Sequence, residues 1–143
     1  MGIYLNPSNN VFKEILSANI YVDKTMMLAV TNEYIDSGNK YICISRPRRF
    51  GKTIASEMLS AYYSKGCDSR ELLEPYKISK DSSFLEKLNR YNVIKLDINS
   101  EYQNTRDKEN LIEEFTEKIK KEMRVEFPQV DITDKDSLAE SML

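Results

Sequence analysis

Gly51, Lys52 and Thr53 are consecutive residues whose types can bind a polyphosphate. They fill the second half of the phosphate-binding pattern G-x-x-x-x-G-K-[ST], and Arg46 stands where that pattern has its first glycine. A glycine lets backbone N–H groups approach phosphate oxygens closely, while the lysine reaches the β- and γ-phosphates and the threonine hydroxyl binds Mg²⁺. The spacing therefore predicts a Walker A-like loop that lacks one glycine.

The predicted site covers both sides of this glycine, because neighbouring arginines add positive charge to the same loop. We expect the phosphates of ATP, or of GTP, to be bound by Arg46, Arg48, Arg49, Phe50, Gly51, Lys52, Thr53 and Ile54. Thr53 is the predicted Mg²⁺ ligand, so the expected cofactor is Mg²⁺ together with ATP.

The elements on either side of the loop are those that such a site requires. Residues 40–45 (KYICIS) form a short apolar run rich in strand formers, which predicts a β-strand. Ile54, Met58 and Tyr62 recur at helical spacing and predict a helix to about residue 64. The N-terminus of that helix would point its free N–H groups at the phosphates. Residues 40–65 are thus expected to form a strand–loop–helix unit.

The rest of the chain predicts further alternation of helices and strands. Residues 1–19 are expected to form an N-terminal arm and a short helix. Further helices are expected at 25–37, 81–90 and 107–127 and from 133 onward, with a second strand at 92–98 and a weak one near 20–22. This pattern predicts an α/β fold of the P-loop NTPase type, with three layers and a mostly parallel sheet. Two clear strands are too few for such a sheet, so we expect residues 1–143 to be the N-terminal part of a longer domain.

The composition excludes several function classes. The chain has 143 residues, a formal net charge of −2 and no histidine. Catalytic systems that need a histidine within the chain are excluded, as are metal sites that need imidazole. The charge gives no sign of a broad nucleic-acid-binding face. Cys43 and Cys67 form no metal-binding motif, which fits a reduced, cytoplasmic protein, and Cys43 is expected to be buried within its strand.

A non-enzymatic function remains open for the same loop. Arg46, Arg48, Arg49 and Lys52 could instead bind nucleic-acid phosphates or an acidic protein partner. Nucleotide binding would depend on Mg²⁺ and on Lys52 and Thr53. Nucleic-acid binding would show a steep salt dependence and would depend more on the arginines. The sequence does not predict an oligomeric state, and no membrane-spanning segment is expected.

The string SRPRRFGKT, preceded by IYVDKT, resembles the predicted AAA-ATPase-like family of P-loop proteins. The resemblance covers roughly residues 2–130 and extends to the arm, which is similar to that of bacterial members. It implies that Arg46 is normal in place of the first glycine and that Gly51, Lys52 and Thr53 bind phosphate and Mg²⁺. Residues 21–25 match a family signature whose chemistry the sequence does not reveal. Two readings stay open: a strand end followed by a helix cap, or direct contact with the nucleotide. Members often carry a PD-(D/E)xK nuclease-like domain further along the chain.

Hydrolysis of ATP needs an acidic residue that holds Mg²⁺ through water at the end of a second strand. Asp97 is the only candidate within the chain, because it follows the apolar run that begins at Val93. The alternative is that Asp97 only caps a strand of the sheet. By the family resemblance, the acidic strand comes later than residue 133. We therefore expect the complete protein to be an ATP hydrolase and these residues to lack its hydrolytic acid.

Overall fold

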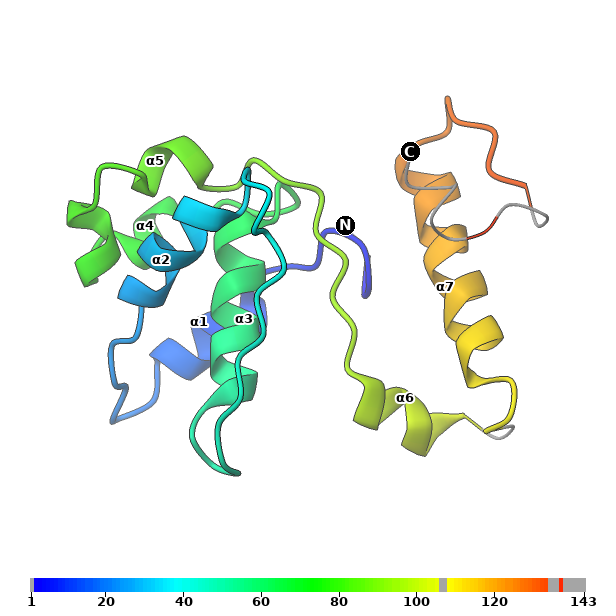
Figure 1. The fold of residues 1–143 in the computed structure, drawn as a ribbon, viewed down its shortest axis with the longest axis horizontal. Coiled ribbons are helices and arrows are strands. Elements are labelled where there is room, and N and C mark those ends of the chain that lie inside the picture. The colour runs from blue at the N-terminus through cyan, green and yellow to red at the C-terminus, as the bar shows by residue number, and fades with distance from the viewer. Residues whose placement is uncertain (1, 106–107, 134–136, 138–143) are drawn as a thin grey trace.

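Helices make up the regular structure of the chain in a computed structural model, which describes residues 2–105, 108–133 and 137. Figure 1 shows α1, α2, α4 and α5 gathered on one side of α3, with α6 and α7 on the other. In chain order the helical segments are α1 (Asn10–Leu16), α2 (Met26–Tyr34), α3 (Lys52–Tyr63), α4 (Arg70–Leu73), the 3-10 helix η1 (Lys77–Lys80), α5 (Phe84–Lys87), α6 (Ile98–Asn104) and α7 (Leu111–Glu126).

The main core forms against the second half of α3. Met58, Ala61 and Tyr62 of this helix are almost completely buried. They pack with Phe12 of α1, Leu28 of α2 and apolar residues of the three short segments that follow α3. Burying this surface is the main force that holds the short helices together, since segments of four residues are not stable alone.

Two adjacent tyrosines of α3 bring hydroxyl groups into this core. The Tyr62 hydroxyl accepts a hydrogen bond from Asn32 Nδ2 at 2.9 Å and donates one to the Phe84 carbonyl at 2.8 Å. The Tyr63 hydroxyl donates to Asn32 Oδ1 at 2.7 Å. Burial raises the pKa of Tyr62 to about 12. The network joins α2, α3 and α5, so both tyrosines have a packing role.

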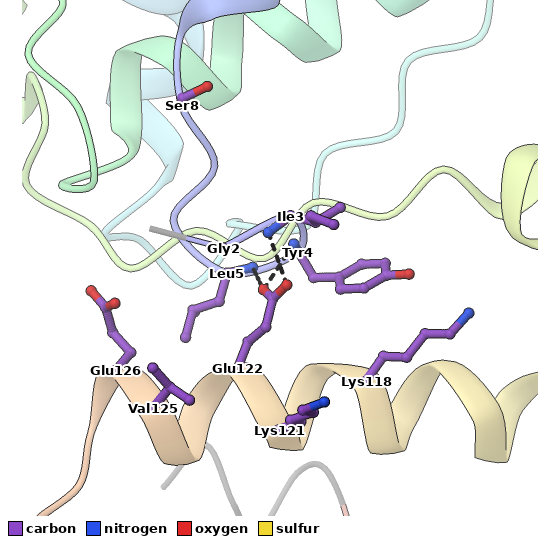
Figure 2. A pocket seen from close by; sticks show the side chains of 10 residues that line it. All are labelled: Gly2, Ile3, Tyr4, Leu5, Ser8, Lys118, Lys121, Glu122, Val125 and Glu126. Carbon is purple, nitrogen blue, oxygen red and sulfur yellow. Dashed lines mark hydrogen bonds between the residues drawn. The ribbon is translucent and has the colours of Figure 1, made fainter.

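A second, smaller core lies between α7 and the N-terminal arm. Leu5 packs with Ile119 and Met123 of α7 and with Ile132. Glu122 extends from α7 to the arm, where its carboxylate accepts hydrogen bonds from three successive backbone N–H groups (Figure 2). The long helix predicted at 107–127 is confirmed as Leu111–Glu126, and the arm supplies the surface on which it packs.

The predicted fold class is wrong: the described residues contain no β-sheet, and their strand pairing is limited to two isolated bridges. The two predicted strand segments do not pair with each other among the described residues, and 92–98 pairs elsewhere. Ile94 bridges to Leu5 of the arm, and Tyr91 bridges to Ser64 after α3. Its last residue, Ile98, begins α6. Because a strand needs a partner for its backbone groups, 40–45 remains an extended segment rather than a strand of a sheet.

The absence of a sheet also overturns expectations about side chains in 40–45. Cys43 is exposed rather than buried, and Tyr41 is 88% exposed. In the other predicted strand segment, the ammonium of Lys95 forms an ion pair with Glu57 of α3. A segment that lies on the surface without a covering layer exposes both of its faces to solvent.

The remaining helices lie at the positions that the sequence predicts, but several are shorter than predicted. The helix expected over 25–37 ends at Tyr34, and the one expected over 81–90 is the single turn Phe84–Lys87. The helix to residue 64 after the loop is confirmed as Lys52–Tyr63. The helix expected from 133 falls almost entirely on residues outside the described part of the chain.

Candidate functional site

The loop between the extended segment 40–45 and α3 has two residues in the left-handed region of backbone conformation. Arg49 has a φ of 68° and Gly51 a φ of 79°. Glycine adopts this conformation without strain, and Gly51 is the N-cap of α3, with no capping side chain among the described residues. The loop therefore turns sharply into the helix at the glycine that the sequence singled out.

The carbonyl groups of this loop are occupied by two lysines of the chain. Lys52 Nζ donates hydrogen bonds to the Arg46 carbonyl at 2.6 Å and to the Pro47 carbonyl at 3.3 Å. Lys24, which precedes α2, donates from Nζ to the Phe50 carbonyl at 3.0 Å. Both ammonium groups thus lie at the loop and hold it in its turn.

The backbone N–H groups of the loop are in the opposite situation. Within the part of the chain that the structure describes, no acceptor receives a hydrogen bond from an N–H group of residues 48–54. The first intrahelical bond of α3 runs from the Ala55 N–H to the Gly51 carbonyl at 2.9 Å. Free N–H groups at the start of a 12-residue helix form a region of positive potential that favours an anion.

Two cavities adjoin the loop. One, of about 680 Å³, lies toward α2 and the extended segment and is lined by residues that include Ile42, Ile44 and Lys52. The other, of about 490 Å³, is lined by Ile20, Tyr21, Val22, Ile54 and other residues. Lys24, Phe50 and Gly51 line both. The walls of each are largely apolar, with charge confined to the loop side, which is a common arrangement in sites for small organic ligands.

The structure places the predicted phosphate-binding residues around this one turn. Gly51 is partly buried at the turn, while Lys52, Thr53 and the neighbouring arginines are exposed. Among the described residues, Arg46, Arg48 and Arg49 form no ion pair. The donor set is a glycine turn, free N–H groups, ammonium groups and the hydroxyl of Thr53, which fits a Mg²⁺-bound polyphosphate.

Asp97, the predicted second metal residue, lies at a helix terminus away from this turn. It caps a helix rather than the expected strand: it is the N-cap of α6, where its carboxylate accepts a hydrogen bond from the Ser100 N–H at 3.0 Å. This bond holds the pKa of Asp97 below its usual value. Asp97 lines neither of the two cavities beside the loop. In the described ranges, no group of three or more carboxylate or thiol residues could hold a metal ion.

Lys24 belongs to the candidate site, but the sequence did not single it out from the other residues of the 21–25 signature. Its string, IYVDKT, stood out in the sequence, but nothing in the spacing places residue 24 beside residue 50. The two are 26 positions apart and meet only because α2 packs near α3. The only signal for Lys24 in the sequence is that it is a basic residue within a distinctive string whose function is unexplained.

Comparison with known proteins assigns the chain to a family. Neither a curated protein nor a solved structure matches the chain. Among the described residues, no helix has both the length and the apolar character that crossing a membrane requires. The sequence profile of the family described as Predicted AAA-ATPase matches residues 9–142, which is nearly the whole chain and includes the loop and both lysines. The chain belongs to this predicted AAA-ATPase family.

Proposed function

We propose that this chain binds a nucleoside triphosphate, with ATP as the first candidate, together with Mg²⁺ through the loop RPRRFGKT. The observation that carries the proposal is the set of backbone N–H groups of residues 48–54, which have no acceptor in the described part of the chain. These groups lie at a left-handed glycine and at the start of α3, where a phosphate would receive several hydrogen bonds at once. Membership of a predicted AAA-ATPase family supports the same ligand.

Each predicted residue has a role in this proposal. Lys52 would exchange its two loop carbonyls for the β- and γ-phosphates, because an ammonium bonds more strongly to a phosphate than to a neutral carbonyl. Thr53 would offer its exposed hydroxyl to Mg²⁺. Arg46, Arg48 and Arg49 would add positive charge, while Phe50 and Ile54 would shape the apolar sides of the phosphate turn.

Hydrolysis requires more than this loop supplies. An acidic residue must hold Mg²⁺ through water, and another group must orient the attacking water. Asp97 already caps α6 and lines neither cavity beside the loop, so the proposal gives it no contact with the metal ion. ATP hydrolysis and a linked nuclease-like domain remain predictions from the family resemblance.

The proposal is tested by calorimetric titration of ATP into the chain and into two variants, with and without Mg²⁺. Lys52→Ala should weaken ATP binding by roughly 100-fold, because it removes a charge-assisted contact to two phosphates. Thr53→Ala should weaken binding about tenfold in Mg²⁺ and have little effect when Mg²⁺ is removed with EDTA.

Lys65→Ala is the matched control, because Lys65 is an exposed lysine whose side chain makes no hydrogen bond or ion pair in the described part of the chain. It should bind ATP like the unchanged protein. A folded wild-type chain that does not bind ATP in Mg²⁺ would refute the proposal. So would a Lys52→Ala variant with unchanged affinity.

A second candidate rests on the arginines. Arg46, Arg48 and Arg49 are exposed and form no ion pair among the described residues, so they could bind a single-stranded nucleic acid. In that case, binding of an oligonucleotide would fall steeply with salt. It would be lost when the three arginines are replaced by serine, and it would be unaffected by Thr53→Ala.

A further inference from the structure

Lys24 lies at the same turn as the predicted phosphate site and comes from a different part of the chain. Its ammonium donates a hydrogen bond to the Phe50 carbonyl at 3.0 Å. A β-carbon added at Gly51 would lie 3.3 Å from the same nitrogen, so Lys24 is in contact with the phosphate turn itself. Lys24 also lines both cavities beside the loop.

The residues on either side of Lys24 are fixed to the core. Asp23 accepts hydrogen bonds from the Thr25 N–H at 2.8 Å, the Thr25 hydroxyl at 2.7 Å and the Lys77 N–H at 3.2 Å. The Thr25 side chain is completely buried, and its hydroxyl also accepts from the Ile78 N–H at 3.2 Å. These bonds anchor the backbone around Lys24 to η1.

Tyr21 anchors the other end of the same segment. Its ring packs edge-on against Phe12 of α1 and Tyr76 before η1, with centroid distances of 6.3 Å and 5.3 Å. The segment from Tyr21 to Thr25 is therefore held at both ends, by hydrogen bonds to η1 and by the rings of Phe12 and Tyr76, and it supports Lys24. Its one long exposed cation, Lys24, reaches over the loop.

The ammonium of Lys24 retains binding capacity. A lysine has three N–H donors, and in the described residues only one of them is used, by the Phe50 carbonyl. No carboxylate forms an ion pair with Lys24 in the described part of the chain, because the adjacent Asp23 is held by Thr25 and Lys77. Two donors and an unneutralised charge remain at the place where a polyphosphate would lie.

We propose that Lys24 is a second phosphate-binding lysine, which contacts the polyphosphate of the nucleotide together with Lys52, since both line the same cavity beside the loop. This inference rests on the proposed function and extends it, because it gives the segment from Tyr21 to Thr25 a function that the sequence did not reveal. Lys24 keeps its bond to the Phe50 carbonyl and directs its remaining donors at phosphate oxygens. The ligand chemistry recognised here is the polyphosphate and not the base.

A purely structural role for Lys24 makes a different prediction, and three substitutions separate the two. Lys24→Arg keeps the charge and the donors. Lys24→Gln keeps a donor for the Phe50 carbonyl but removes the charge. Lys24→Ala removes both. If Lys24 only tethers the loop, Gln should bind ATP like the wild type. If it binds phosphate, Gln should resemble Ala.

The test is calorimetric titration of ATP, and of inorganic tripolyphosphate, into the full 143-residue chain and these variants in Mg²⁺. We expect Lys24→Ala and Lys24→Gln to lose about tenfold in affinity for both ligands, as removal of one charge-assisted contact predicts. Lys24→Arg should stay close to the wild type, as should the control Lys65→Ala. Thermal unfolding of the ligand-free variants should be unchanged, which shows that the support itself is intact.

The possible outcomes are distinguishable. Wild-type affinity in Lys24→Gln, or a loss for ATP that tripolyphosphate does not share, would overturn the second-lysine proposal while leaving the proposed function in place. A loss of affinity in Lys24→Ala that coincides with a lower unfolding temperature, and that Gln does not show, would identify a tether and also overturn it. A folded wild-type chain that binds neither ligand would refute both proposals.

Discussion

The N-terminal arm and the loop before α3 both wrap backbone around charged side chains, but with opposite polarity. In the arm, the N–H groups of Ile3, Tyr4 and Leu5 converge on the carboxylate of Glu122 at 2.8–2.9 Å (Figure 2). In the loop, carbonyl groups converge on the ammonium groups of Lys24 and Lys52. The arm thus binds an anion that belongs to the chain itself. The loop binds two cations of the chain, and its N–H groups have no acceptor in the described residues.

This difference separates a structural contact from the proposed binding site. A set of N–H groups that already holds an internal carboxylate gains little from an external anion, because the carboxylate must first be displaced. A loop whose internal charges are positive attracts an external anion instead. The arm is thus a fastening between the N-terminus and α7, and the loop is the place where a ligand would complete the hydrogen bonding.

Glu122→Ala would break the first half of this comparison and should have the largest effect. It leaves three N–H groups of the arm without their acceptor and separates the arm from α7. Since hydrogen bonds to charged groups contribute about 1.5–3 kcal/mol each and are not additive, we expect a loss of about 3 kcal/mol in the free energy of unfolding. Urea unfolding followed by circular dichroism measures it.

The control for Glu122→Ala is Glu113→Ala, since Glu113 is an exposed glutamate in the first turn of the same helix. It should change the free energy of unfolding by less than about 0.5 kcal/mol. Affinity for ATP should be the same in both variants. A Glu122→Ala protein with unchanged stability would show that the arm contact does not hold the fold, and the comparison would fail.

Gly51→Ala tests the other region of the comparison, the loop before α3, and should have a smaller effect on stability than Glu122→Ala. At a φ of 79° a side chain costs about 1–2 kcal/mol, and the new β-carbon would lie 3.3 Å from Lys24 Nζ. Because the methyl group also projects where phosphate oxygens would approach the N–H groups, ATP affinity should fall at least about tenfold. Thermal unfolding and ATP titration measure the two effects separately.

Gly38→Ala is the matched control for this variant. A β-carbon at Gly38 would meet no atom within 4 Å, and its φ lies outside the positive range. Both stability and ATP affinity should remain as in the wild type. If Gly51→Ala and Gly38→Ala have the same unfolding temperature and the same ATP affinity, Gly51 is an ordinary residue at a helix terminus. The loop would then not differ from the rest of the surface in its capacity to bind an anion.

The sequence predicted the local elements of this site better than the architecture around them. The pattern at Gly51 placed the start of α3 correctly, because glycine at the turn and apolar spacing after it are local signals. The prediction of a sheet is wrong because strand formers in 40–45 and 92–98 indicate an extended backbone but do not specify which segment pairs with it. Here Ile94 pairs with Leu5, nearly 90 residues away, through contacts that only the fold brings together.

The side-chain contacts of the site were hidden for the same reason. Lys24 at the loop and Glu122 at the arm depend on how helices pack, and no spacing rule reports that. Their residue types gave a partial signal: an unexplained lysine in a distinctive string, and a glutamate in an amphipathic helix. Charged residues are frequent on solvated helix faces, so composition alone does not separate a structural carboxylate from an exposed one.

Acid should weaken the support of Lys24 before it affects the apolar core, and this is the smallest effect expected here. Burial opposes ionisation of Asp23, but hydrogen bonds from Thr25 and Lys77 outweigh it and hold its pKa below the usual value. A carboxylate whose pKa is lower in the folded state stabilises the fold above its unfolded pKa of about 3.9, and that stability is lost as pH falls through the folded value.

Asp36, Asp81 and Asp97 also have lowered pKa values. The variant Asp23→Asn is therefore needed to isolate the contribution of Asp23 to the pH dependence of stability. Its unfolding temperature should be lower than that of the wild type at neutral pH, and the two should converge below about pH 4. Parallel curves across that range would show that Asp23 contributes through packing alone and that the support of Lys24 does not depend on its charge.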